Sequence, residues 1–118
     1  MSHPARTYHL VPAEVWQATD PAADYAPETF PQDGFIHTTH DPAEVVAVGN
    51  RYYRDDPRAY VVLHIDTAFV RAPIRIEDSG GHFPHIYGPL NREAIIAVTD
   101  VARDADGTFL RMRRDRNT

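Results

Sequence analysis

The sequence contains neither cysteine nor lysine among its 118 residues. Without cysteine, the chain has no disulfide framework, no thiolate nucleophile and no thiolate metal site. Without lysine, it has no Schiff base and no P-loop, because the P-loop lysine contacts the transferred phosphate. Polar chemistry therefore falls to its twelve arginines, its seven histidines, its carboxylates and its hydroxyls.

Long apolar runs are also missing from the sequence. No apolar segment approaches the roughly 20 residues that cross a bilayer, and no apolar run follows the charge at the N-terminus, as it would in a signal peptide. We expect a cytoplasmic protein with no membrane partner. The length suits one domain over residues 1–118, with a core from about 6 to 112 and a basic tail over 113–118.

Hydrophobic periodicity predicts an α+β domain of about six strands and two helices. The expected helices begin at Pro12 and at Asp41-Pro42, where an N-cap residue is followed by a proline in the first turn. Three prolines in residues 20–33 predict a loop. The expected strands and extended segments are 6–11, 34–39, 59–66, 69–77, 82–90, 94–102 and 108–112, the last after a turn at Asp106-Gly107.

Two histidines fall in the middle of predicted strands. Alternation places His9 on one face with Thr7, and His37 on one face with Thr39. A buried imidazole needs hydrogen-bond partners for both ring nitrogens, so each histidine is either a satisfied core residue or part of a polar cleft. Arg75 and Glu77 share one strand face, and this second polar pair favours the cleft.

Two further histidine pairs have the spacing of metal ligands, His37 with His40 and His82 with His85. Residues three apart on a strand point to opposite faces, whereas a metal ion needs convergent ligands about 2 Å away. We therefore expect no metal site.

Several blocks of the sequence occur in an order that resembles a known family. They are residues 8–11 with Trp16, residues 33–39, Asn50, residues 62–66, Glu77 and residues 83–90. The most specific blocks are Gly34-Phe35-Ile36-His37 and Phe83-Pro84-His85-Ile86-Tyr87-Gly88-Pro89-Leu90. Together they resemble the bacterial family known as domain of unknown function 952. Thr38 stands where many relatives carry a small cysteine or serine.

The resemblance implies an ADP-ribosyltransferase-like fold, a small split β-sheet domain nearest to the RNA 2′-phosphotransferase branch. It implies a cleft shaped for NAD and an NAD- or nucleotide-dependent transfer of a glycosyl or phosphate group. In the wider superfamily the first-strand histidine bonds the nicotinamide-side ribose, a role that falls on His9. The second-strand position lines the nicotinamide pocket and falls on His37. Glu77 and His85 both remain open for the third position.

The site residues expected from these arguments form two groups. The catalytic group is His9, His37, Glu77 and His85, and the NAD-binding group is His9, Thr38, Thr39, Arg75 and Tyr87. Arg51 is an alternative to Arg75 for pairing a pyrophosphate oxygen, and Trp16 and Tyr87 either stack on a ring or pack in the core. The alternative function is a binding module for a nucleotide or small molecule without transfer chemistry. An RNA partner fits the resemblance but has no support in the residues themselves.

Overall fold

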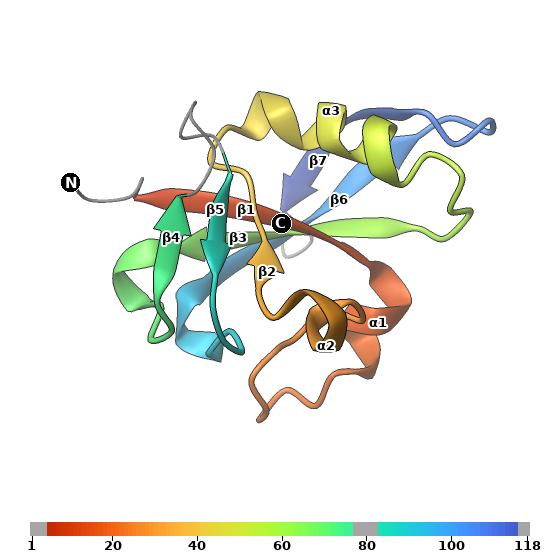
Figure 1. Ribbon diagram of the computed structural model, residues 1–118. Coiled ribbons are helices and arrows are strands. Elements are labelled where there is room, and N and C mark those ends of the chain that lie inside the picture. Colours follow the sequence, from red (N-terminus) through yellow and green to blue (C-terminus); the bar gives the residue numbers. More distant parts are fainter. Residues whose placement is uncertain (1–4, 77–82, 116–118) are drawn as a thin grey trace.

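The computed structural model describes residues 5–76 and 83–115 (Figure 1). Over these two ranges the chain forms strands, α-helices and short 3₁₀ helices. In chain order they are β1 (Arg6–Pro12), α1 (Ala13–Ala18), α2 (Phe30–Asp33), β2 (Ile36–His37), α3 (Pro42–Tyr52), β3 (Tyr60–Asp66), η1 (Thr67–Phe69), β4 (Ile74–Ile76), β5 (Pro84–Ile86), η2 (Arg92–Ala94), β6 (Ile95–Arg103) and β7 (Phe109–Asp115).

The strands form two antiparallel sheets. The large sheet has the order β1-β3-β6-β7, and the small sheet has the order β2-β5-β4. The predicted α+β class is therefore confirmed, with two sheets and short helices. The two sheets meet at Tyr8 and Thr39, which exchange backbone hydrogen bonds of 2.8 and 2.9 Å. This bridge fixes the segment after β2 against the outer edge of β1.

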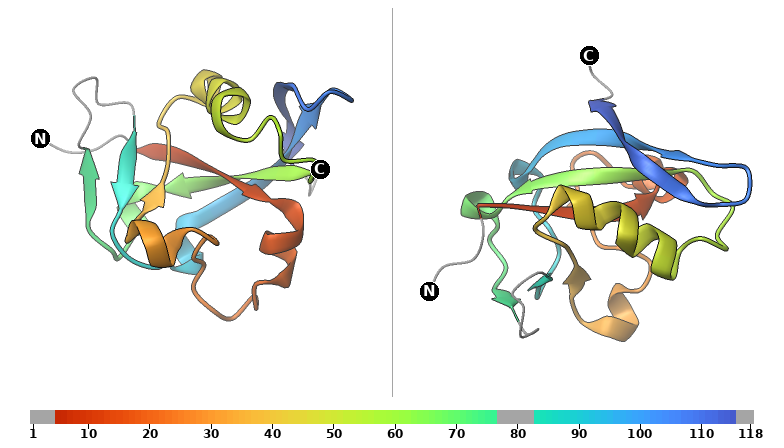
Figure 2. Two further views of the ribbon diagram at one scale, coloured as in Figure 1. Left: turned by 45° about the vertical axis from the view of Figure 1, so that its right-hand side comes forward. Right: turned by 90° about the horizontal axis from the view of Figure 1, so that it is seen from above.

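Two apolar cores flank the large sheet, because β3 buries both of its faces. Odd-numbered residues of β3 such as Leu63 pack with Ile36 and Ile86 of the small sheet. Even-numbered residues such as Val62 pack with Val45 of α3 and with β7. Figure 2 shows α3 lying along the large sheet and the small sheet standing to one side of it. A strand that is buried on both faces has a nearly continuous apolar sequence, without alternation.

The predicted helix at residues 41–53 is confirmed as α3. Its N-cap residue Asp41 accepts a hydrogen bond from the backbone N–H of Ala43, and Pro42 stands in the first turn. The spacing of Val45, Val48 and Tyr52 predicts one buried apolar stripe along this helix, but Tyr52 is 66% exposed. Gly49 takes the buried position instead, because a side chain there would meet the ring of Phe109.

Two local predictions over residues 20–39 are wrong. Residues 30–33 form the helical turn α2 inside a segment predicted as loop, with Gly34 in the left-handed conformation (φ 77°) closing it. The strand expected over 34–39 is limited to β2. His37 is exposed whereas Thr39 is buried, so the two do not share a face. The chain leaves the small sheet after His37 in order to bridge β1 at Thr39.

The helices of the described ranges are short. The longest, α3, has 11 residues, about half of what a bilayer crossing needs. None of the helices over 5–76 and 83–115 has the length and apolar character of a membrane span.

Candidate functional site

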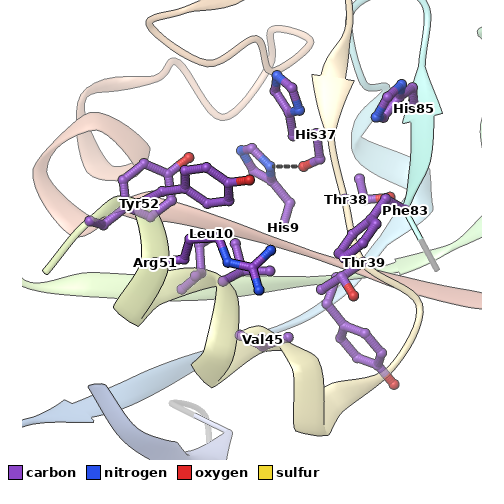
Figure 3. Close-up of a pocket in the computed structure, with 13 residues that line it drawn as sticks. His9, Leu10, His37, Thr38, Thr39, Val45, Arg51, Tyr52, Phe83 and His85 are labelled. Atoms are coloured by element: carbon purple, nitrogen blue, oxygen red, sulfur yellow. Dashed lines mark hydrogen bonds between the residues drawn. The ribbon is translucent and has the colours of Figure 1, made fainter. Parts of the chain in front are cut away.

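A pocket of about 580 Å³ opens between α3, the edge strand β1 and the small sheet (Figure 3). Its volume lies in the range of small-molecule sites, roughly 300–1,000 Å³. Apolar and aromatic side chains form most of the wall, with a few polar groups among them. The lining residues are Tyr8, His9, Leu10, His37, Thr38, Thr39, Val45, Val48, Arg51, Tyr52, Tyr53, Phe83 and His85.

His9 lies at the back of this pocket with both ring nitrogens hydrogen-bonded. Nδ1–H donates to the carbonyl oxygen of His37 at 2.7 Å, and Nε2 accepts from the Tyr25 hydroxyl at 2.8 Å. A carbonyl oxygen only accepts, so the proton of the neutral ring sits on Nδ1. His9 therefore joins β1 to β2 through the His37 carbonyl oxygen, and both of its ring nitrogens are bound by groups of the protein.

Burial keeps His9 neutral. The side chain is 6% exposed, and desolvation lowers its pKa from 6.5 to about 4. Burial also raises the pKa of Tyr25 well above its usual value, so its hydroxyl keeps the proton that it donates. At neutral pH the His9–Tyr25 pair is an uncharged, satisfied network, which fits a positioning role for His9 in the pocket wall.

His37 stands at the pocket rim. The sequence predicted a buried side chain, but 55% of it is exposed, because β2 turns it to the outer face of the small sheet while Ile36 faces the core. Nε2–H donates to the Asp33 carboxylate at 3.0 Å. Asp33 is the last residue of α2, and it lies four residues before His37 in the chain. The helical turn therefore positions the carboxylate beside the imidazole.

Two neighbouring threonines play different parts in the wall. The hydroxyl of Thr7 donates to Thr38 Oγ1 at 2.6 Å, and the Thr38 hydroxyl donates to the carbonyl oxygen of Pro84 at 2.6 Å. Thr38 thereby ties β1 to β5. Thr39 Oγ1 is buried with no hydrogen-bond partner among the described residues. An unsatisfied buried hydroxyl costs about 1–3 kcal/mol, which a ligand atom in the pocket would remove.

The C-terminal half of α3 forms the opposite wall. In Figure 3, Arg51 and Tyr52 face the pocket from the helix, opposite Thr39 and Phe83. Tyr52 is the most exposed large aromatic side chain of the described residues. No acidic residue occurs among the described residues that line the pocket. The wall therefore combines aromatic faces with one permanent positive charge at Arg51.

The edge of β1 adds a backbone recognition element. Tyr8 turns its N–H and C=O away from β3 toward Thr39. Residues two apart on an antiparallel strand present their backbone groups to the same edge, so Leu10 turns its own N–H and C=O to that edge. Leu10 lines the pocket. The N–H donor and the C=O acceptor of Leu10 therefore face any ligand that lies along β1.

The structure brings some of the expected site residues together and separates others. His9, His37, His85, Thr38 and Thr39 all line the pocket. A second group does not line it. Arg75 and Tyr87 lie on the outer face of the small sheet, where the Arg75 guanidinium stands 5.3 Å from the Tyr87 ring centre. Trp16 packs against Tyr25 beside the core. Glu77 and His82 fall outside the described residues.

Several residues of the site gave no signal in the sequence. Tyr25 lies in the proline-rich segment predicted as loop, yet it is fully buried against His9. Asp33 is recognisable only by its spacing of four residues from His37. Tyr52 falls on the apolar stripe predicted for α3, yet its side chain is exposed and lines the pocket. Among the described residues, no cluster of three histidine or acidic side chains has the geometry to hold a metal ion.

Solved structures of one other protein share this fold. The crystal structure of protein CC0527 from Caulobacter crescentus superposes with a TM-score of 0.74, and its sequence is 23% identical over 89% of this chain and 93% of that chain. The solution NMR structure of CC0527 gives a TM-score of 0.66 over 87% and 90% of the two chains. At this identity the likeness concerns the fold. No curated protein matches the chain.

A family profile gives the assignment that the sequence blocks suggested. The profile described as "Protein of unknown function (DUF952)" matches residues 10–98. This range contains α3, β3 and the whole small sheet, and with them most of the pocket wall. The chain belongs to the DUF952 family.

Proposed function

We propose that the pocket binds a nucleotide of the NAD class, as the ADP-ribosyltransferase-like resemblance implies. The observation that carries the proposal is the pairing of an aromatic-walled pocket of about 580 Å³ with one arginine and no lining carboxylate among the described residues. Such a pocket suits a flat ring joined to an anionic group. Arg51 pairs the phosphate, and the ring lies against Tyr52 or Phe83.

The edge of β1 makes the proposal more specific. A carboxamide carries a donor group, its NH2, next to an acceptor oxygen, and the Leu10 backbone offers their complement at the pocket wall. The nicotinamide of NAD has such a carboxamide on a flat ring. A carboxylate in its place has acceptors only and would face the Leu10 carbonyl oxygen. The orphaned Thr39 hydroxyl supplies one further contact for a polar ligand atom.

Calorimetric titration with NAD and with its nicotinic acid analogue tests this arrangement. NAD is expected to bind more tightly, by about tenfold or more, because a mismatched carboxylate leaves a buried backbone group unpaired. ADP-ribose, which lacks the ring, controls for the contribution of the phosphates. Absence of heat with all three ligands would overturn the proposal. Equal affinity of NAD and the acid analogue would remove the role given to Leu10.

A second candidate function is transfer chemistry on the same ligand, and the His37–Asp33 pair favours it. Asp33 holds Nε2–H of His37, which leaves Nδ1 as the basic nitrogen of the neutral ring. His37 takes the proton of an acceptor hydroxyl while the oxygen of that hydroxyl forms a bond to C1′ of the ribose. The C1′–N bond breaks, and its electron pair leaves with nicotinamide. The His9 network holds the pocket wall during this step and carries no proton.

Nicotinamide release from NAD, followed by chromatography, tests the transfer reaction. Asp33→Asn is expected to slow release roughly 100-fold, the scale of general-base catalysis, while NAD affinity stays within about threefold. Asp24→Asn is the matched control, because Asp24 is an exposed carboxylate outside the pocket. NAD binding without any nicotinamide release in the wild type would assign the pocket to a binding module.

A further inference from the structure

The outer face of the small sheet carries a row of nitrogen-bearing side chains. The strand register pairs His37 with His85 and His85 with Arg75. Neighbouring strands lie about 4.8 Å apart, so the three side chains stand side by side across β2, β5 and β4. The neighbouring residues Ile36 and Ile86 turn inward and are fully buried. The apolar core of the sheet therefore lies on its other face and does not require this row.

Aromatic rings surround the row. Phe35 stacks on His85 with ring centres 4.3 Å apart and planes inclined by 22°. Tyr87 lies 5.1 Å from Phe35 and carries the Arg75 guanidinium 5.3 Å from its ring centre. His37 meets His85 edge to face at 5.4 Å. The result is a continuous layer of flat rings with the Arg75 guanidinium beside it, which we call the stacking face.

The stacking face carries one permanent positive charge. Arg75 is exposed, and His37 binds the Asp33 carboxylate. An antiparallel sheet can leave one face in water, but a solvated face has no need of stacked aromatic rings. Flat rings beside an arginine match a chain of bases joined by phosphates, because every base has a face to stack and every linkage has an anion to pair.

We propose that the stacking face binds a short stretch of single-stranded nucleic acid. Bases pack against the half-buried Phe35 and Tyr87 rings, and Arg75 pairs a phosphate. A three-stranded sheet is wide enough for about two bases, by comparison with four-stranded sheets that stack two or three. A duplex hides its bases within its own stack and does not fit this face.

The stacking face is continuous with the pocket through His37 and His85, which belong to both. A strand lying on the face therefore reaches the pocket rim at the His37–Asp33 pair. If the pocket holds an NAD-class ligand, the strand supplies the acceptor hydroxyl of the transfer reaction. This last step rests on the proposed function, whereas binding to the stacking face does not.

Fluorescence anisotropy with a labelled single-stranded RNA of eight nucleotides, at about 50 mM salt, tests the proposal. The wild type is expected to bind the strand at micromolar concentration and to release it as salt rises. Tyr87→Leu removes a stacking ring and is expected to weaken binding at least fivefold. Arg75→Gln changes an exposed side chain of β4, should keep the fold, and is expected to weaken binding by about the same factor.

Matched variants separate the possible outcomes. Arg71→Gln removes the same charge from an exposed arginine that pairs with Glu93 away from the row, and it should leave binding within twofold. Equal effects of Arg75→Gln and Arg71→Gln, or equal binding of a duplex of the same length, would overturn the proposal. Arg51→Gln should reduce NAD binding and leave RNA binding intact. A wild type that binds RNA but not NAD would contradict the pocket alone, and a wild type that binds NAD but not RNA would contradict the stacking face alone.

Discussion

Acidification from pH 7 to pH 4 is expected to destabilise the fold by about 3 kcal/mol through His9. Burial lowers the pKa of His9 to about 4 in the folded state, against 6.5 in the unfolded chain. Between these two values the unfolded state binds a proton that the folded state does not, so stability falls as the pH falls. A pKa difference of this size corresponds to about 3 kcal/mol. Above pH 6.5 the stabilisation is fully present.

Urea unfolding of the wild type and of His9→Asn at several pH values measures this effect. The asparagine cannot titrate, and its amide can still donate to the His37 carbonyl oxygen. It is expected to be less stable than the wild type at pH 7, and the difference should shrink by about 3 kcal/mol toward pH 4. Equal losses of stability in the two proteins would show that His9 is not a buried neutral group.

Other titrating groups act in a different range of pH. The hydrogen bonds from Arg58 and Tyr60 lower the pKa of the Asp56 carboxyl below its usual value of 3.8. A carboxyl with a lowered folded pKa stabilises the protein above its unfolded pKa, and that stabilisation is lost as the pH falls through the folded value. Its loss therefore begins near pH 4, below the range in which His9 acts, and both proteins share it.

The sequence predicted those elements whose pattern is local. β1, β3 and β6 each follow a run that is apolar or alternates over at least six residues, and α3 begins with an N-cap and a proline. α2 was missed because a helix of four residues has no period to detect. Its stop at Gly34 depends on one left-handed residue, which a sequence rich in turns does not distinguish from a loop.

The site could be predicted only in part, for a related reason. His9 and His37 were recognisable because histidines interrupt apolar strands, and both line the pocket. Their partners were not recognisable, because Tyr25 and His9 are 16 residues apart and meet only when the proline-rich segment folds back over the core. The opposite orientations of His37 and Thr39 follow from the bridge between the two sheets. Alternation within one strand contains no information about that bridge.

Arg51→Gln is expected to weaken binding of NAD and ADP-ribose roughly 10- to 100-fold. A charge-assisted hydrogen bond contributes about 1.5–3 kcal/mol, and Arg51 is the one arginine among the described residues that line the pocket. The glutamine preserves the length and polarity of the side chain, so the loss reports the charge. The side chain is exposed on α3, and the variant should keep the stability of the wild type.

The control for this variant is Arg54→Gln. Arg54 lies just beyond the end of α3, is also exposed, and pairs with Asp106 on the side away from the pocket. Calorimetric titration of both variants at two salt concentrations distinguishes a specific contact from a general effect of net charge. A specific contact predicts a large loss in Arg51→Gln and less than a twofold loss in Arg54→Gln at either salt concentration. Equal losses in the two variants would place the phosphates of the ligand outside the pocket, because a long-range field does not distinguish two arginines only three residues apart in the chain.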